Sequence, residues 1–250
     1  MFMNRDLLIP VFKKDFYSFF KTPTGYIFLL SFILATNYLV FSPSIGAFYQ
    51  MRHASLNALF NFLPTTFMVF VAAISMKTWA EERKSGTIEL LMTLPVKTFE
   101  LVLAKFFSSL AFISVALLLT IPLFLSLIYL GNPDYGAVFS GYLGSVLLAS
   151  LFLSLGGLCS ALTKGPVISF ISSISLFYFL VMLSSTAVQD FLSSFFHPFA
   201  MEILEALNPI DKFEMMMRGV IRLSDLVYFV MMISFYLFCT TIILEEKRGS

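Results

Sequence analysis

Charged side chains are scarce in this 250-residue sequence, and they are unevenly distributed. Asp, Glu, Lys and Arg together make up 12% of the residues, against roughly a quarter in ordinary soluble domains. The formal net charge at pH 7 is +1, so the chain has no basic excess that would attract a nucleic acid. These shortages exclude a typical soluble domain and a nucleic-acid-binding protein.

Cysteine and histidine are also rare. Cys159 and Cys239 lie in separate apolar runs, and His53 and His197 are far apart in the sequence. Two isolated cysteines form no disulfide framework, and no HExxH or comparable spacing joins the histidines into a metal site. The GxxxxGK[ST] loop that binds nucleotide phosphates is missing as well. We therefore expect no metal, no directly bound cofactor and no catalytic residues in this chain.

Hydrophobic residues dominate what is present. They make up 58% of the sequence, including 31 Phe, and the mean hydropathy is +0.89. About 20 consecutive apolar residues span the roughly 30 Å hydrocarbon core of a membrane. We predict an all-α integral membrane protein that forms a single transmembrane domain over residues 1–250. Its six predicted transmembrane segments are Gly25–Phe41, Ala58–Met76, Leu101–Leu130, Ala137–Leu162, Val167–Val188 and Leu226–Leu244. The third is long, so we expect it to project beyond the bilayer as a helical stalk.

The basic residues predict how these segments are oriented. With the N-terminus in the cytoplasm, 12 of the 16 Lys and Arg residues fall on the cytoplasmic side. The positive-inside rule therefore places both termini in the cytoplasm of a multi-pass protein. Lys105 is counted among these cytoplasmic charges, and apart from it the six segments contain no Asp, Glu, Lys, Arg or His. Because ion-coupled carriers depend on intramembrane ionisable groups, this composition argues against one. We also expect no cleavable signal peptide.

The N-terminal segment, residues 1–24, has an amphipathic pattern. Leu8, Phe12, Phe16, Phe19 and Phe20 share one arc of a helical wheel, and the opposite arc is polar and basic. This pattern is typical of a helix that lies in the cytoplasmic headgroup layer of the membrane. An ordinary cytosolic helix is the alternative.

Small residues recur at four-residue spacing in the fourth predicted span. Such residues allow helices in lipid to approach each other closely. They predict helix packing within the chain, with a dimer contact or a substrate path as the alternative. The residues are Gly141, Ser145, Ala149, Gly157 and Ala161.

The external segment 189–225 is unusually apolar for a loop. Prolines at positions 198 and 209 predict two short helices, because proline disfavours helix in the residue before it. The aromatic and aliphatic clusters between the charges suggest that these helices re-enter the outer face of the bilayer or pack on a partner.

The first cytoplasmic loop, residues 80–97, concentrates charge in a chain that otherwise avoids it. The stretch from Trp79 to Lys97 reads WAEERKSGTIELLMTLPVK and contains six charged residues in 19 positions. A short apolar helix is predicted from Thr87 to Leu94, ended by Pro95. Two helical turns are not stable alone, so the apolar side must be covered. The residues leave open whether this chain's own bundle, the lipid surface or a partner covers it.

The stretch EERKSGTIELLMTLPVKTFELVLAKF resembles the first cytoplasmic loop of the membrane permeases of type-2 ABC exporters. The residues in register with that pattern are Glu82, Gly86, Thr87, Glu89, Leu91, Pro95, Val96 and Lys105. The later stretch NPIDKFEMMMRGVIRLSDLVYF resembles the same family, particularly its gliding-motility-associated branch.

The resemblance implies a permease that pairs with an identical or homologous second permease and with two ABC ATPase subunits, in the bacterial cytoplasmic (inner) membrane. ATP and Mg would bind to the ATPase partner. The loop would form a coupling helix that docks on the ATPase. The docking residues would be Glu81, Glu82, Arg83, Lys84, Gly86, Thr87, Ile88, Glu89, Leu91, Met92 and Pro95. The broken external helices would close an outer gate through Phe195, Phe196, Phe199, Leu204 and Leu207.

Two other functions remain open at this point. In the first, the complex transports nothing and relays ATPase motion to an extracytoplasmic protein, as in a gliding or envelope-associated machine. In the second, the chain is a stand-alone scaffold or channel without an ATPase.

Overall fold

The computed structural model describes residues 5–42, 56–88, 97–131, 133–194 and 206–249. Every regular element in these ranges is a helix, which confirms the predicted all-α class. In chain order the helices are α1 (Arg5–Lys21), α2 (Pro23–Phe41), α3 (Asn57–Thr78), α4 (Ala80–Lys84), α6 (Thr98–Leu118), α7 (Ile121–Leu130), α8 (Tyr135–Leu162), α9 (Pro166–Met182), α10 (Thr186–Ser193), α12 (Pro209–Met217) and α13 (Leu223–Gly249).

Five stretches are long and apolar enough to cross a membrane. They are Pro23–Phe41, Asn57–Thr78, Thr98–Tyr129, Tyr135–Leu162 and Leu223–Lys247, and they match five of the six predicted segments. The remaining prediction, one continuous helix over Val167–Val188, differs from the structure. There α9 ends at Met182 after 17 residues, and α10 begins at Thr186 after a turn. Length and composition therefore assign five long spans, and α9 is a shorter apolar helix.

The third predicted span is also interrupted. Helix α6 ends at Leu118 and α7 begins at Ile121, so the expected continuous stalk is two helices. Pro122 explains the break, because it has no N–H to donate and disfavours helix in the residue before it. The Thr120 hydroxyl lies 2.6 Å from the Leu117 carbonyl oxygen and 2.9 Å from the Tyr142 hydroxyl, which fixes this corner against α8.

Helix α8 is the centre of the molecule and packs against α3, α6, α9, α12 and α13. Most of its residues are buried, and many are small. The Phe152 ring stacks on Phe177 of α9 with 4.5 Å between the ring centroids. The N-terminus of α8 is capped by Asp134, whose carboxylate accepts hydrogen bonds from the backbone N–H groups of Gly136 and Ala137. The small side chains explain how so many helices reach one central helix.

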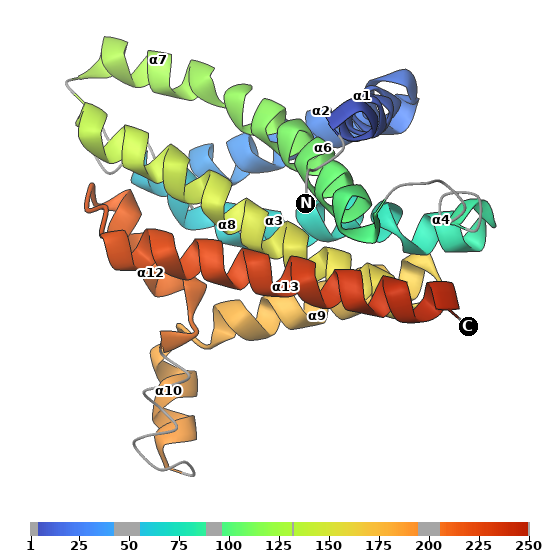
Figure 1. Ribbon diagram of the computed structural model, residues 1–250. Helices are drawn as coiled ribbons and strands as arrows, with labels where there is room; N and C mark the ends of the chain where they lie inside the picture. The colour runs from blue at the N-terminus through green and yellow to red at the C-terminus, as the bar shows by residue number, and fades with distance from the viewer. Residues whose placement is uncertain (1–4, 43–55, 89–96, 132, 195–205, 250) are drawn as a thin grey trace.

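The long helices alternate in direction across the bundle (Figure 1). The ends of α3, α8 and α13 and the starts of α6 and α9 gather at one end, together with α4. We call this the loop end. The short helices α7, α10 and α12 lie at the opposite end, where α10 projects away from the bundle.

The N-terminal helix α1 lies at the side of the bundle and packs on α6 and α2. Phe19 stacks on Phe112 of α6 with 4.5 Å between the ring centroids, and Phe20 meets the same ring edge-on at 5.6 Å. Part of the apolar arc predicted for residues 1–24 is therefore covered by the chain's own α6. The choice between a membrane-surface helix and a cytosolic one stays a prediction.

Candidate functional site

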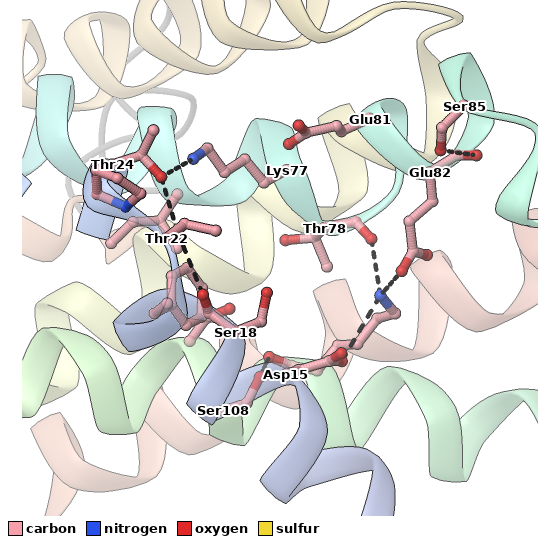
Figure 2. A pocket seen from close by; sticks show the side chains of 15 residues that line it. Asp15, Ser18, Thr22, Thr24, Lys77, Thr78, Glu81, Glu82, Ser85 and Ser108 are labelled. Carbon is pink, nitrogen blue, oxygen red and sulfur yellow. Dashed lines mark hydrogen bonds and ion pairs between the residues drawn. The ribbon is translucent and has the colours of Figure 1, made fainter.

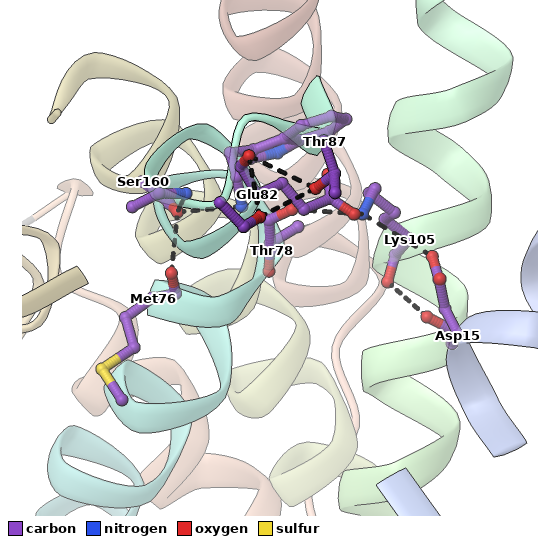
Figure 3. A network of polar contacts seen from close by, with 11 residues as sticks. Asp15, Met76, Thr78, Glu82, Thr87, Lys105 and Ser160 are labelled. Atoms are coloured by element: carbon purple, nitrogen blue, oxygen red, sulfur yellow. Dashed lines mark hydrogen bonds and ion pairs between the residues drawn. The ribbon is translucent and has the colours of Figure 1, made fainter. Parts of the chain in front are cut away.

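The charged loop leaves the bundle at a kink between α3 and α4. Trp79 lies between the two helices with its side chain 1% exposed. A kink frees backbone N–H groups from the helical hydrogen-bond ladder, and these need other acceptors. The Ser160 hydroxyl oxygen of α8 accepts hydrogen bonds from the backbone N–H groups of Trp79 at 3.2 Å and Ala80 at 2.9 Å. The base of the loop is thus bonded to the central helix (Figure 3).

Arg83 of α4 makes a second attachment to α8. Its guanidinium donates hydrogen bonds to the backbone carbonyl oxygens of Thr163 and Ala161, the latter at 3.0 Å. Lys247 of α13 donates to the same Ala161 oxygen at 2.8 Å. These carbonyls have no partners within the helix, and cations at a helix C-terminus are favoured by its dipole. Partial burial lowers the pKa of the Arg83 guanidinium, which nevertheless stays charged at any physiological pH.

The third attachment is a buried ion cluster around Lys105 of α6. The Lys105 ammonium lies 2.5 Å from Glu82 Oε1, 3.2 Å from the Thr78 carbonyl oxygen and 3.7 Å from Asp15 Oδ2. It also lies 5.0 Å from the centre of the Trp79 ring, within cation–π range. Only 6% of the Lys105 side chain is exposed. We call Lys105, Glu82 and Asp15 the ion cluster; it joins α6, α4 and α1 (Figure 3).

Two effects of opposite sign act on the pKa of Glu82 in the ion cluster. Burial raises the pKa of the Glu82 carboxyl above its usual value of 4.5, and the neighbouring Lys105 ammonium partly offsets that rise. Glu82 Oε2 and Asp15 Oδ2 are buried and have no hydrogen-bond partner in the part of the chain that the structure describes. Removing the Lys105 ammonium would leave two partly buried carboxylates without their closest counterion, which is destabilising.

A tight turn follows α4 and sets the direction of the loop. Gly86 has φ of +74°, a left-handed conformation that glycine adopts without the steric cost of a Cβ atom. The Ser85 and Thr87 hydroxyls lie 2.9 Å apart across the turn, and each also bonds the Glu82 carbonyl oxygen. The helix predicted to begin at Thr87 follows this turn, and of that helix the described residues include Thr87 and Ile88.

The predicted docking residues divide into three groups. Glu82 and Arg83 point inward and are held by the chain's own contacts, and Ile88 packs against the core. Four others are exposed at the loop end: Glu81, Lys84, Gly86 and Thr87. Glu89, Leu91, Met92 and Pro95 lie outside the described residues. The described part of the loop therefore has an inner side that holds it to the bundle and an outer side that is free of it.

The small residues predicted on α8 also differ among themselves. A Cβ atom on Gly141 would lie 2.3 Å from the Phe60 ring of α3, so this glycine permits a close approach. Ser145, Ala149 and Ala161 are fully buried. A Cβ atom on Gly157 would meet nothing within 4 Å. The close contact belongs instead to the adjacent Gly156, where a Cβ atom would lie 2.4 Å from Ser75 Oγ of α3.

At the opposite end, most of the predicted gate is not described. Phe195, Phe196, Phe199 and Leu204 lie outside the described residues. Leu207 is 40% exposed, and its carbonyl oxygen accepts a hydrogen bond from Tyr228 of α13 at 2.5 Å. Helix α12 begins at Pro209, with the Asn208 side chain accepting from the Ile210 N–H at 3.0 Å. The predicted break at Asn208-Pro209 is confirmed.

The sequence interpretation missed the roles of Lys105, Asp15 and Ser160. Lys105 was counted as a cytoplasmic charge, yet it is buried. The sequence position of Lys105 could have revealed its burial, since no other Asp, Glu, Lys, Arg or His lies within the six predicted spans. Such residues are usually paired with a partner. The partners themselves, 90 and 23 positions earlier in the chain, carry no local signal.

The loop end as a whole holds a charged loop to α1, α6 and α8 of an apolar bundle. The sequence matches the family described as ABC-2 family transporter protein over residues 9–244. The chain belongs to the ABC-2 transporter family. No curated protein matches the sequence.

Membership of the ABC-2 transporter family gives the general role of the chain. ABC-2 family permeases are multi-pass membrane subunits without a catalytic site of their own. They generally act with ABC ATPases, and ATP binds to that partner. The expectation of an ABC transporter permease that is not itself an enzyme is therefore confirmed.

Proposed function

We propose that this ABC-2 permease is the membrane subunit of an ATP-driven export complex and that ATPase motion enters it through the 80–97 loop. Two ABC ATPase subunits with ATP and Mg, and a second permease, would complete the complex. The chain would form one permease domain in the bacterial inner membrane, with α9 as the sixth crossing and both termini in the cytoplasm. The alternating helix directions and the concentration of Lys and Arg at the loop end support this orientation.

The observation that carries the proposal is the ion cluster. Glu82 is on the loop side and reaches Lys105 on α6 and, through it, Asp15 on α1. Ser160 and Arg83 bond the same short helix to α8. A displacement of α4 by a docked ATPase would therefore be felt by three helices at once. A loop without these bonds could move freely and would transmit little force.

The outer side of the loop is the proposed docking surface. Lys84 and Thr87 are exposed there, and Leu91 and Met92 are the proposed apolar anchors. Glu81 is also exposed, but its side chain lines a hollow beside α1, α3 and α6 and is not part of this surface. Glu82, Arg83 and Ile88 would contribute by holding the loop in place, since their side chains face the bundle.

Replacing Leu91 and Met92 together with Asp tests this docking surface. We expect the double variant to insert in the membrane and to lose co-purification of its ABC ATPase, because a buried carboxylate has no partner in an apolar contact. The matched control is Val220→Asp with Ile221→Asp, two exposed apolar residues at the opposite end. Equal ATPase recovery from the two double variants would refute docking through the loop.

A second function is favoured by one observation. Helix α10 projects away from the bundle at the end opposite the loop (Figure 1), and Phe191 on it is 64% exposed. Such an element suits the relay of ATPase motion to an extracytoplasmic protein, as the resemblance to the gliding-motility-associated branch also suggests. ATPase activity that requires an outer partner, with nothing accumulated in vesicles, would favour this function over export.

A further inference from the structure

Two adjoining hollows lie where α1 turns into α2. The first, of about 520 Å³, is lined mainly by polar side chains from α1, α3, α4 and α6. The second, of about 300 Å³, is an apolar groove between α2 and α3. The two hollows share four lining residues: Phe19, Thr24, Ile74 and Lys77. A polar hollow and an apolar groove therefore adjoin at these residues, which is the arrangement that an amphipathic molecule requires.

Two opposite charges on the wall of the polar hollow are not paired with each other. Lys105 is neutralised within the ion cluster. Lys77 of α3 and Glu81 of α4 lie on the two sides of the kink at Trp79 and form no ion pair within 4 Å among the described residues. Both side chains line the hollow in Figure 2, where the Lys77 ammonium points toward Thr24. It lies 3.5 Å from Thr24 Oγ1. The wall thus offers one cation and one anion to a ligand.

The apolar groove runs from Lys77 back along the transmembrane part of α3. Ala73, Phe70 and Val69 line it from α3, and Ile27 and Phe28 line it from α2. The eight helical steps from Val69 to Lys77 span about 12 Å, enough for the upper half of an acyl chain. Both helices are membrane-span candidates, so the groove lies at the depth of the hydrocarbon and the polar hollow lies at a helix end.

We propose that this space binds one phospholipid with a zwitterionic headgroup, its phosphate at Lys77, its ammonium at Glu81 and one acyl chain in the groove between α2 and α3. An anionic headgroup fits less well, because Glu81, Glu82 and Asp15 outnumber the two lysines on the wall. The lipid is a resident ligand beside the ion cluster and is distinct from any transported cargo. The inference goes beyond the proposed function and does not depend on it.

The hydroxyl groups that line the polar hollow restrict which zwitterionic headgroup it can bind. Ser18, Thr22, Thr78 and Ser108 line it, and their oxygens can accept hydrogen bonds from the N–H groups of a primary ammonium. A quaternary ammonium has no N–H and is recognised instead by cages of aromatic rings. Phe19 is the one aromatic residue that lines this hollow. The chemistry therefore selects phosphatidylethanolamine over phosphatidylcholine.

The experiment uses the full-length chain, purified without an ATPase from vesicles of equal phosphatidylethanolamine, phosphatidylcholine and phosphatidylglycerol. Native mass spectrometry then measures the lipid that stays bound. We expect one retained phosphatidylethanolamine and a loss of roughly tenfold in its retention in Glu81→Gln, because a charge-assisted hydrogen bond is removed. Lys77→Gln should weaken retention similarly. The controls are Glu245→Gln and Lys164→Gln, two exposed charges outside both hollows, which should leave retention unchanged.

Filling the groove supplies a separate test. Ala73→Phe should abolish retention of all three lipids, whereas Ile171→Phe on an exposed face of α9 should not. If Ala73→Phe fails to fold, the Glu81→Gln comparison alone decides. Lipids bound without headgroup preference and unaffected by Glu81→Gln would overturn the proposal and indicate nonspecific surrounding lipid. A preference for phosphatidylglycerol would overturn it too. Either failure would leave docking of an ATPase at the loop untouched.

Discussion

Lys105 is the residue on which the loop end depends most. Its ammonium joins Glu82 of α4 to Asp15 of α1 from a position on α6 where 6% of its side chain is exposed. Three helices that are distant in the sequence therefore share one buried cation. Trp79, the single tryptophan of the chain, lies against the same ammonium and is buried. Its fluorescence reports on this contact without any added label.

Lys105→Met should lower the free energy of unfolding by about 2 kcal/mol, because it leaves two partly buried carboxylates without their closest cation. Adding Glu82→Gln to that variant should cost little more, since its partner is already lost. The double-mutant cycle should give a coupling energy of about 1–3 kcal/mol. Thermal unfolding followed by Trp79 fluorescence measures it. Lys164→Met, at an exposed lysine, is the control for loss of one charge; additive costs would show that Lys105 and Glu82 act independently.

Glu82 should also make stability depend on pH. Burial raises its pKa in the folded protein above 4.5, so the folded state binds a proton more readily than the unfolded state does. The free energy of unfolding therefore decreases as pH rises from about 4.5 through the folded-state pKa. Unfolding measured across this interval should show that decrease in the wild type and a flatter dependence in Glu82→Gln. A decrease of equal slope in Glu82→Gln would assign it to another group.

At the scale of the helices, the close packing of α8 on α3 depends on which glycine faces α3. Gly156→Ala places a Cβ atom 2.4 Å from Ser75 Oγ and 2.7 Å from Ser75 Cβ, and we expect a loss of about 1–3 kcal/mol from overpacking. The neighbouring Gly157→Ala meets nothing within 4 Å and should be neutral or stabilising, because alanine favours helix. The midpoint of thermal unfolding compares the two variants. Equal midpoints would mean that α3 and α8 separate easily at this point.

The helices were largely predictable from the sequence, and their interruptions were less so. Five of the apolar runs became long helices because a run of that length and composition is sufficient by itself. The breaks at Leu119-Thr120 and at Leu183 to Ser185 were missed. Pro122 could have signalled the first. The second falls at Ser184 and Ser185, and hydroxyl side chains compete with the helical backbone for hydrogen bonds; the Ser185 hydroxyl oxygen accepts from the Val188 N–H at 3.3 Å.

The candidate site was predictable only in part, for a related reason. The charged loop, its glycine and its proline are local patterns that can be recognised in the sequence alone. Which loop residues turn inward depends on partners that are distant in the sequence. Arg83 meets carbonyls of α8, and Glu82 meets a lysine of α6. The helical wheel also placed Gly157 in a packing contact that belongs to Gly156, a shift of one residue.

At the scale of the whole molecule, the two ends of the bundle differ in character. The loop end collects charge and bonds it to α1, α6 and α8, whereas the opposite end has the short helices α7, α10 and α12 (Figure 1). A family that acts with ABC ATPases needs one end that receives motion. We propose that the loop end receives the ATPase motion, through the exposed outer side of the loop at Lys84 and Thr87.

A photo-cross-linking amino acid at position 84 tests that claim most directly. Lys84 is exposed beside the turn of Gly86, on the outer side of the loop. In membranes that contain the permease and its ABC ATPase, position 84 should cross-link to the ATPase, and the same amino acid at position 220 should not. Cross-links from position 84 only to lipid or to this chain itself, with the complex intact, would contradict the claim.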